Sequence, residues 1–210
     1  MILLRINLKT QNEINMKKLI LSLAVVTIAT MTANAQVGFG AKAGANFATL
    51  SGSDAKDIDG KAMQVGANFG VIVQIPVSGM FSVNPELVFS MQGVKFTGGS
   101  DKLNYLNIPV MAHFGFNGGF FVEGGPQVGF MMSAKQKDAS GTTDIKEFLS
   151  TTDFSLGLGA GFKSASGFGG NARVNIGLSS IDKGDPKAKI NNMVIQAGVF
   201  YMFGGNKGKE

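Results

Sequence analysis

Cysteine and tryptophan are absent from this chain of 210 residues, and histidine occurs only once, as His113. Without cysteine the protein has no disulfides, no thiol nucleophile and no thiolate metal ligands. A single histidine excludes a zinc site that needs two histidine ligands. The glycine pairs also lack the strand–loop–helix setting of a phosphate-binding loop. We therefore expect neither a metal nor an organic cofactor.

Charged residues are scarce as well, at 16% of the chain against roughly 25% in an average soluble domain. Glycine (30 residues) and phenylalanine (17 residues) are abundant instead. This composition suits a protein whose outer surface faces lipid. The net charge is +5, and the first 35 residues contribute +3 of it, from four basic residues and one acidic residue. The remaining +2 is too weak to indicate a nucleic-acid partner.

The N-terminal region has the layout of a secretory signal peptide. Met16 is followed by two lysines, a mostly apolar run over 19–30 and the cleavage motif Ala33-Asn34-Ala35. The apolar run is shorter than the roughly 20 residues of a membrane-spanning helix, which argues against an uncleaved N-terminal anchor. We predict an upstream mis-start over 1–15, a signal peptide over 16–35 and a mature chain that begins at Gln36.

The body of the chain alternates between apolar and polar residues with a period of two, which indicates strands with one face of each kind. Over 63–75 the odd-numbered residues are all apolar, and the even-numbered ones are glycine or polar except Ile72. Each alternating segment is long enough for a tilted transmembrane strand of about 9–11 residues. We predict eight strands, over 37–50, 62–76, 80–96, 103–116, 120–133, 153–163, 169–181 and 192–203.

The predicted connections differ in length between the two ends of the strands. The connections after the second, fourth and sixth strands are tight, at Val77-Ser78-Gly79, Asn117-Gly118-Gly119 and 164–168. The others are polar and longer, at 51–61, 97–102, 134–152 and 182–191. Within the third of these, 145–149 forms either one helical turn or part of a plain loop. Short turns at one end and long loops at the other are typical of a transmembrane barrel, with the loops outside the cell.

The polar face of these strands carries mainly Gly, Asn, Gln and Ser, which suits a narrow lumen better than a water-facing surface. Closure of the sheet also satisfies every backbone hydrogen bond, as lipid requires. We therefore predict an all-β fold, an eight-stranded antiparallel transmembrane β-barrel of the OmpA/OmpX type over 36–203, with a short polar tail over 204–210. Its location would be the outer membrane of a Gram-negative cell, reached by export to the periplasm.

Several segments resemble the porin-like (PorT-like) family of outer-membrane β-barrels. The segments are Gly40–Asn46 (GAKAGAN), Tyr105–Pro109 (YLNIP), Val122–Gly129 (VEGGPQVG) and 153–162, in the first, fourth, fifth and sixth predicted strands. The resemblance covers nearly the whole predicted mature chain. It implies an outer-membrane location and an eight-stranded barrel, but it implies no particular activity and no pore.

Six ionisable residues fall on the lumen side of the predicted strands, in the half next to the periplasm. They are Lys42, Glu86, His113, Glu123, Lys163 and Arg173. One interpretation is a proton or ion relay, because ionisable groups inside a membrane are often functional. The other is a plug of mutually paired charges that closes the barrel. We favour the plug, because charges buried in a narrow space are stable only when they are paired.

Two functions follow from these patterns. The favoured one is a structural or interaction barrel at the cell surface, whose partners are outer-membrane lipid, the barrel-assembly machinery during insertion and an unidentified surface or envelope protein. The alternative is a narrow channel or porin-like conduit for small solutes or ions. An enzyme acting on lipid acyl chains would need a Ser–His–acid group near the outer leaflet, whereas His113 is predicted to face inward near the periplasmic end. We therefore expect no enzyme and no catalytic residues.

Overall fold

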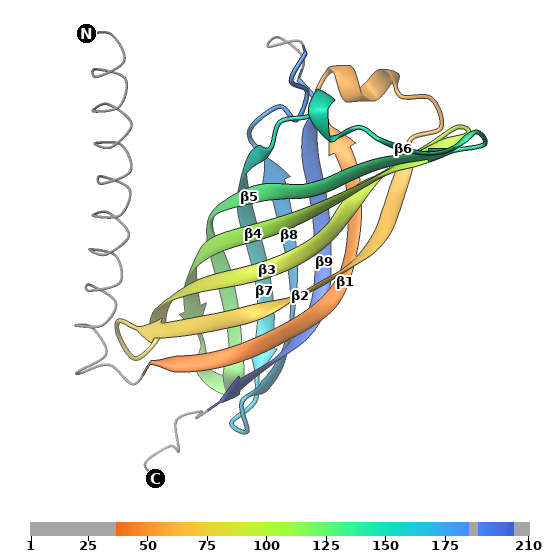
Figure 1. Cartoon of the computed structure of the whole chain (residues 1–210). Helices are drawn as coiled ribbons and strands as arrows, with labels where there is room; N and C mark the ends of the chain where they lie inside the picture. The colour runs from red at the N-terminus through yellow and green to blue at the C-terminus, as the bar shows by residue number, and fades with distance from the viewer. Residues whose placement is uncertain (1–36, 185–188, 204–210) are drawn as a thin grey trace, which may run out of the picture. The chain divides into compact units, whose positions relative to one another are not determined.

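A computed structural model describes residues 37–184 and 189–203 of the chain (Figure 1). The predicted upstream segment, the signal peptide and the polar tail lie outside the described residues. Eight long strands make up most of the described chain: β1 Gly38–Ser51, β2 Ala62–Pro76, β3 Phe81–Phe96, β4 Gly99–Gly115, β5 Phe120–Asp138, β7 Thr152–Lys163, β8 Phe168–Gly177 and β9 Asn191–Phe203. The short elements are strand β6 (Gly141–Asp144) and three 3-10 turns, η1 (Asp54–Asp57), η2 (Asn117–Gly119) and η3 (Lys146–Phe148).

The eight long strands form a closed antiparallel barrel, as the alternating sequence predicts. Around the barrel the strands pair in the order β1-β2-β3-β4-β5-β7-β8-β9, and β9 pairs with β1 to close it. In the closing pair Ala45 lies opposite Ala197. Closure leaves no free edge among these strands, so their backbone groups find partners without water.

The two faces of the barrel wall are inverted relative to those of a soluble protein. Large apolar side chains point outward and are exposed, and several are more than half exposed, such as Phe69 (54%), Phe154 (55%) and Leu158 (54%). Polar side chains point inward and are buried, among them Asn46 and Arg173. An apolar outer surface around a polar interior is typical of a β-barrel that is surrounded by lipid. No helix among the described residues is long and apolar enough to cross a bilayer.

The strand boundaries differ from the prediction mainly where the sheet extends past the apolar band. The polar loop expected over 97–102 is wrong, because only Thr97 and Gly98 separate β3 from β4. Lys95 pairs with Ser100, so the ladder continues almost to the turn. Polar residues on both faces hide a strand from a periodicity test, since that test depends on one face being apolar.

The segment over 134–152 is also more ordered than the polar connection that the sequence predicts. Strand β5 continues to Asp138, and β6 folds back on it as a hairpin. The helical turn left open over 145–149 is present as the 3-10 turn η3. Strand β8 ends at Gly177, short of the predicted 181. The backbone N–H of Leu178 still donates to the Phe154 carbonyl oxygen, but the N–H of Phe154 donates to the Ser179 hydroxyl and not to a backbone carbonyl of that segment.

The connections define two ends of the barrel. The turn end carries the connections β2–β3, β4–β5 and β7–β8, which span only 77–80, 116–119 and 164–167. The loop end carries the other connections, including η1, β6 and η3. Because transmembrane barrels keep their short turns on the periplasmic side, we assign the turn end to the periplasm and the loop end to the exterior.

An apolar cluster lies toward each end of the lumen. The collar, at the turn end, consists of Ile72, Phe121, Phe200 and Met202. The seal, at the loop end, consists of Leu50, Ala55, Val94, Leu103, Tyr105, Met131, Ala134 and Ile181. The seal recruits residues from outside the barrel strands, since Ala55 belongs to η1 and Ile181 to the connection between β8 and β9. The polar interior therefore lies between two apolar layers.

Candidate functional site

Four charged side chains form a chain of ion pairs in the lumen, which we call the partition: Lys42, Glu86, Glu123 and Arg173. Lys42 Nζ lies 3.0 Å from Glu86 Oε2. Arg173 donates from Nη2 to Glu86 Oε1 at 2.7 Å and from Nη1 to Glu86 Oε2 at 3.1 Å. Its Nε donates to Glu123 Oε1 at 3.0 Å. Both carboxylates are therefore held by one guanidinium.

The partition crosses the barrel from wall to wall. Arg173 is on β8 and Glu86 on β3, and these strands lie four positions apart in both directions around the eight-strand ring. Their two parallel hydrogen bonds have the fork geometry that arginine and a carboxylate adopt together. Lys42 on β1 and Glu123 on β5 join from the two remaining sides. The ion pairs thus span the full width of the lumen.

The partition combines charge neutrality with burial. Two cations face two carboxylates, and each of the four side chains is at most 6% exposed. Buried ions are tolerated only where their partners and hydrogen bonds replace water. Asn171 supplies one further bond, donating to Glu123 Oε1 at 2.9 Å. Glycine makes the fit possible at β7, where a Cβ on Gly159 would lie 2.9 Å from the same carboxylate oxygen.

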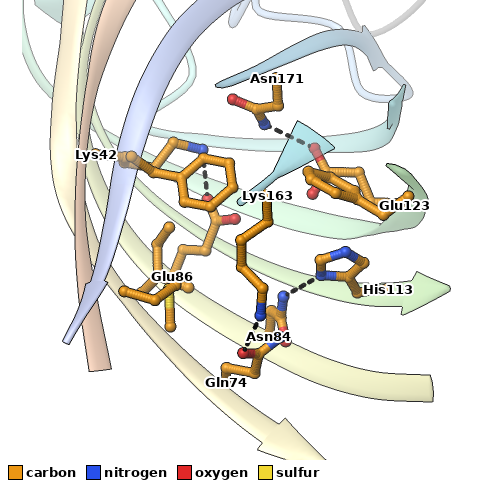
Figure 2. Close-up of a pocket in the computed structure, with 12 residues that line it drawn as sticks. Lys42, Gln74, Asn84, Glu86, His113, Glu123, Lys163 and Asn171 are labelled. Atoms are coloured by element: carbon orange, nitrogen blue, oxygen red, sulfur yellow. Dashed lines mark hydrogen bonds and ion pairs between the residues drawn. The ribbon is translucent and has the colours of Figure 1, made fainter. Parts of the chain in front are cut away.

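His113 and Lys163, the other two predicted lumen charges, lie beside the partition without joining its ion pairs (Figure 2). The Nδ1 atom of His113 is 2.9 Å from the side-chain nitrogen of Asn84. The centroid of the His113 ring lies 4.0 Å from the centroid of the Phe121 ring. Lys163 donates to Gln74 Oε1 at 3.1 Å. The sequence-based hypothesis of six interacting ionisable residues therefore resolves into four charged side chains in ion pairs and two ionisable side chains that bond to neutral amides.

A small cavity lies beside the partition. Its lining includes Lys42, Glu86 and Glu123 of the partition and Phe121, Phe200 and Met202 of the collar. Its volume is about 20 Å³, enough for one or two waters. Such a volume leaves no room for a solute.

The middle of the lumen contains an amide cluster centred on Asn46, which sequence analysis did not single out. Asn46 donates to Ser90 Oγ at 2.9 Å and to the Met91 carbonyl oxygen at 2.7 Å. Its Oδ1 accepts hydrogen bonds from Asn68 at 2.7 Å and from Gln196 at 3.0 Å. The sequence does show Asn and Gln repeatedly on the polar faces of the strands. The alternation alone does not show which of these side chains contact each other across the lumen.

Nearer the loop end, a second cluster of amide and hydroxyl groups surrounds the carboxylate of Asp153. Its carboxylate accepts hydrogen bonds from Asn192 at 3.0 Å and from the Ser179 hydroxyl at 3.0 Å. Asn192 also donates to the Tyr105 hydroxyl at 3.1 Å. Tyr105 connects this cluster to the seal. Buried polar side chains therefore occupy the lumen both at the level of Asn46 and at the level of Asp153.

The arrangement favours packing and neutralisation over chemistry. Within the described ranges, no group of three or more histidine and acidic side chains is placed to hold a metal ion. The side chain that contacts a ring nitrogen of His113 is that of Asn84, and no serine hydroxyl bonds to this ring in that part of the chain. The hydrogen bonds of the lumen thus link structural groups to one another.

Comparison with known proteins places the chain among bacterial barrels. Residues 31–183 match the family described as outer membrane protein beta-barrel domain. No curated protein sequence matches the chain. Among solved structures, Neisserial surface protein A (NspA) is 13% identical, covers 79% of this chain and 97% of its own, and has a TM-score of 0.50. Ail, the attachment invasion locus protein of Yersinia pestis, is 16% identical, covers 79% and 98%, and has a TM-score of 0.47.

Identities this low show a likeness of fold alone, and the family match carries the assignment. It covers well over half of the chain. The closed barrel of the structure agrees with the β-barrel domain that the family description names. The chain therefore belongs to the outer membrane protein β-barrel domain family, and its place is the outer membrane of a Gram-negative cell.

Proposed function

We propose that the protein is a PorT-like barrel with a structural or interaction role at the cell surface and a lumen that conducts no solutes. The observation that carries this proposal is the bidentate pair between Arg173 and Glu86, which joins opposite walls of the barrel. A solute that followed the lumen would have to separate these ions, and removing one partner from a buried pair costs about 3–5 kcal/mol.

The apolar clusters support the same proposal. The collar packs beside the partition toward the turn end, and the seal lies at the loop end. A conduit needs a continuous polar path that is wide enough for its solute. The partition, the collar and the seal each interrupt such a path, so the surface of the barrel is left as its working part.

The proposed partners follow from that surface. The outer wall contacts outer-membrane lipid, and the connections at the loop end meet the exterior, where a surface or envelope protein could bind. Insertion would require the barrel-assembly machinery of the cell. Export would use the signal peptide over 16–35, with cleavage after Ala35. Mass spectrometry of the N-terminus of protein extracted from membranes tests the cleavage, and an intact N-terminus would contradict it.

Conductance in planar bilayers tests the closed lumen. We expect the unmodified protein to produce no stable conductance steps. The double variant Arg173→Ala/Phe121→Ala, which removes the centre of the partition and one ring of the collar, should produce small ones. Folding of each variant is verified by the shift in electrophoretic mobility between unboiled and boiled samples. Stable steps from the unmodified protein would favour the alternative function, a narrow channel.

A further inference from the structure

Four exposed lysines gather on the outer face of the sheet near the loop end. They are Lys95 on β3, Lys102 on β4, and Lys135 and Lys137 on β5, and we call them the lysine patch. They lie outside the lumen, and the partition and the seal do not involve them. Their role is therefore independent of how the barrel is filled.

The strand register brings these lysines together. Lys102 lies directly opposite Lys135. Ser100 lies opposite both Lys95 and Lys137, one on each neighbouring strand. Opposed side chains have Cβ atoms about 5 Å apart, and residues two strands apart are separated by roughly 10 Å. The four ammonium groups thus converge on an area that matches one or two phosphate groups.

Nearby carboxylates offset only part of this positive charge. Within the described part of the chain, none of the four ammonium groups lies within 4 Å of a carboxylate. Asp144 lies opposite Lys135 and offsets one of the four charges, while its Oδ1 accepts a hydrogen bond from the backbone N–H of Lys146 at 2.9 Å. Like charges directly opposite each other destabilise a strand pair, so an anion bound between Lys102 and Lys135 would relieve a repulsion that the fold leaves in place.

The lysine patch begins where the lipid-facing rows end. The last outward apolar residues before it are Met91 on β3, Leu106 on β4 and Met132 on β5. Three or four residues separate each from the nearest lysine of its strand, which is about 10–13 Å along the strand. With a tilt of about 45°, this places the lysines roughly 7–9 Å beyond the hydrocarbon, close to the depth of the headgroup layer.

We propose that the lysine patch binds the phosphate groups of anionic lipid in the outer leaflet. The inference rests on the proposed function in one respect, since it treats the outer surface at the loop end as the working part of the barrel. Charge complementarity and depth together select a lipid headgroup. The bound lipid would fix the depth and the tilt of the barrel in the leaflet.

The test uses the purified full-length protein in zwitterionic detergent, with lipid A carrying two phosphates as the probe. The variant Lys102→Gln/Lys135→Gln/Lys137→Gln removes three charges from the patch. The matched control, Lys56→Gln/Lys183→Gln/Lys189→Gln, removes three exposed charges from the connections at the loop end. One lysine near an anionic surface contributes a factor of about five to affinity. We expect the patch variant to lose at least tenfold in affinity, and the control to stay within twofold of the unmodified protein.

Two results would overturn the proposal. In the first, the two triple variants lose affinity equally, which would mean that net charge alone attracts the lipid. In the second, the patch variant binds lipid A normally but loses binding to a soluble sulfated polysaccharide, which would assign the patch to a surface polyanion. Neither result bears on conductance, so failure here leaves the closed lumen standing, and conduction by the unmodified protein would leave the lipid measurement intact.

Discussion

The two halves of the lumen are filled by different chemistry. Toward the turn end, four full charges form the partition, and Arg173 alone bonds to both carboxylates. Toward the loop end, amides and hydroxyls surround Asn46 and the carboxylate of Asp153, and the apolar seal lies beside Tyr105. The same barrel wall therefore encloses a layer of ion pairs and a layer held mainly by neutral groups.

This difference predicts different sensitivity to substitution. Loss of one ion from the partition leaves opposite charges buried without compensation, and an uncompensated buried charge is among the costliest defects in a protein. Loss of one amide leaves uncharged donors and acceptors, and these can rearrange to bond to other polar groups nearby. Loss of an apolar side chain from the seal leaves a cavity. Substitutions in each layer should therefore reduce stability by different amounts.

The largest effect is expected for Arg173→Ala. Both Glu86 and Glu123 lose their shared partner, so the free energy of unfolding should fall by about 3–5 kcal/mol. Urea unfolding in detergent measures the change, with Val174→Ala as the control, because Val174 is the next residue and points toward lipid. Equal losses for the two variants would mean that the partition does not stabilise the barrel.

Leu103→Ala probes the seal at the other end of the lumen. Leu103 is 1% exposed, and truncation of a buried leucine typically costs about 2–5 kcal/mol through lost transfer energy and the cavity left behind. Leu106→Ala on the same strand is the matched control, since Leu106 faces outward and lipid fills the space that it vacates. A greater loss for Leu106→Ala would show that lipid contact outweighs the seal.

Asn46→Ala tests the amide cluster. Asn68 and Gln196 would lose their acceptor, and each buried group left unsatisfied costs about 1–3 kcal/mol before rearrangement. Because the two amides can turn toward each other, we expect a net loss near the lower end of that range, again measured by urea unfolding. Thr49→Ala, on the outer face of β1, serves as the control. A loss as large as that for Arg173→Ala would erase the distinction between the ionic and the neutral layers.

The smallest effect is expected for Lys163→Gln. Lys163 is half-buried and bonds to the neutral Gln74, so the substitution removes a charge without orphaning a carboxylate. The net value of one hydrogen bond, about 1 kcal/mol, sets the upper limit of the loss of stability. A larger loss of stability in the same unfolding assay would mean that Lys163 interacts electrostatically with the charges of the partition.

Much of the fold could be predicted because lipid and water impose opposite demands on the two faces of a strand. The alternation over 63–75, for example, located β2 (Ala62–Pro76) at its observed bounds. Prediction failed where both faces meet water, as in the first residues of β4 and in β6. There the polar residues that form the ladder look like a loop, because the apolar face that distinguishes a strand is missing.

The alternation in the sequence is enough to show which side chains face the lumen. Side chains alternate between the two faces of a strand, so the apolar row marks the face toward lipid and the other row faces inward. The alternation therefore placed Lys42, Glu86, Glu123 and Arg173 together in one narrow space. The alternation does not show that these four form ion pairs while His113 and Lys163 bond to amides. A contact across the lumen depends on the depth of each residue and on the wall that faces it, and both are set by strand register and by closure of the barrel.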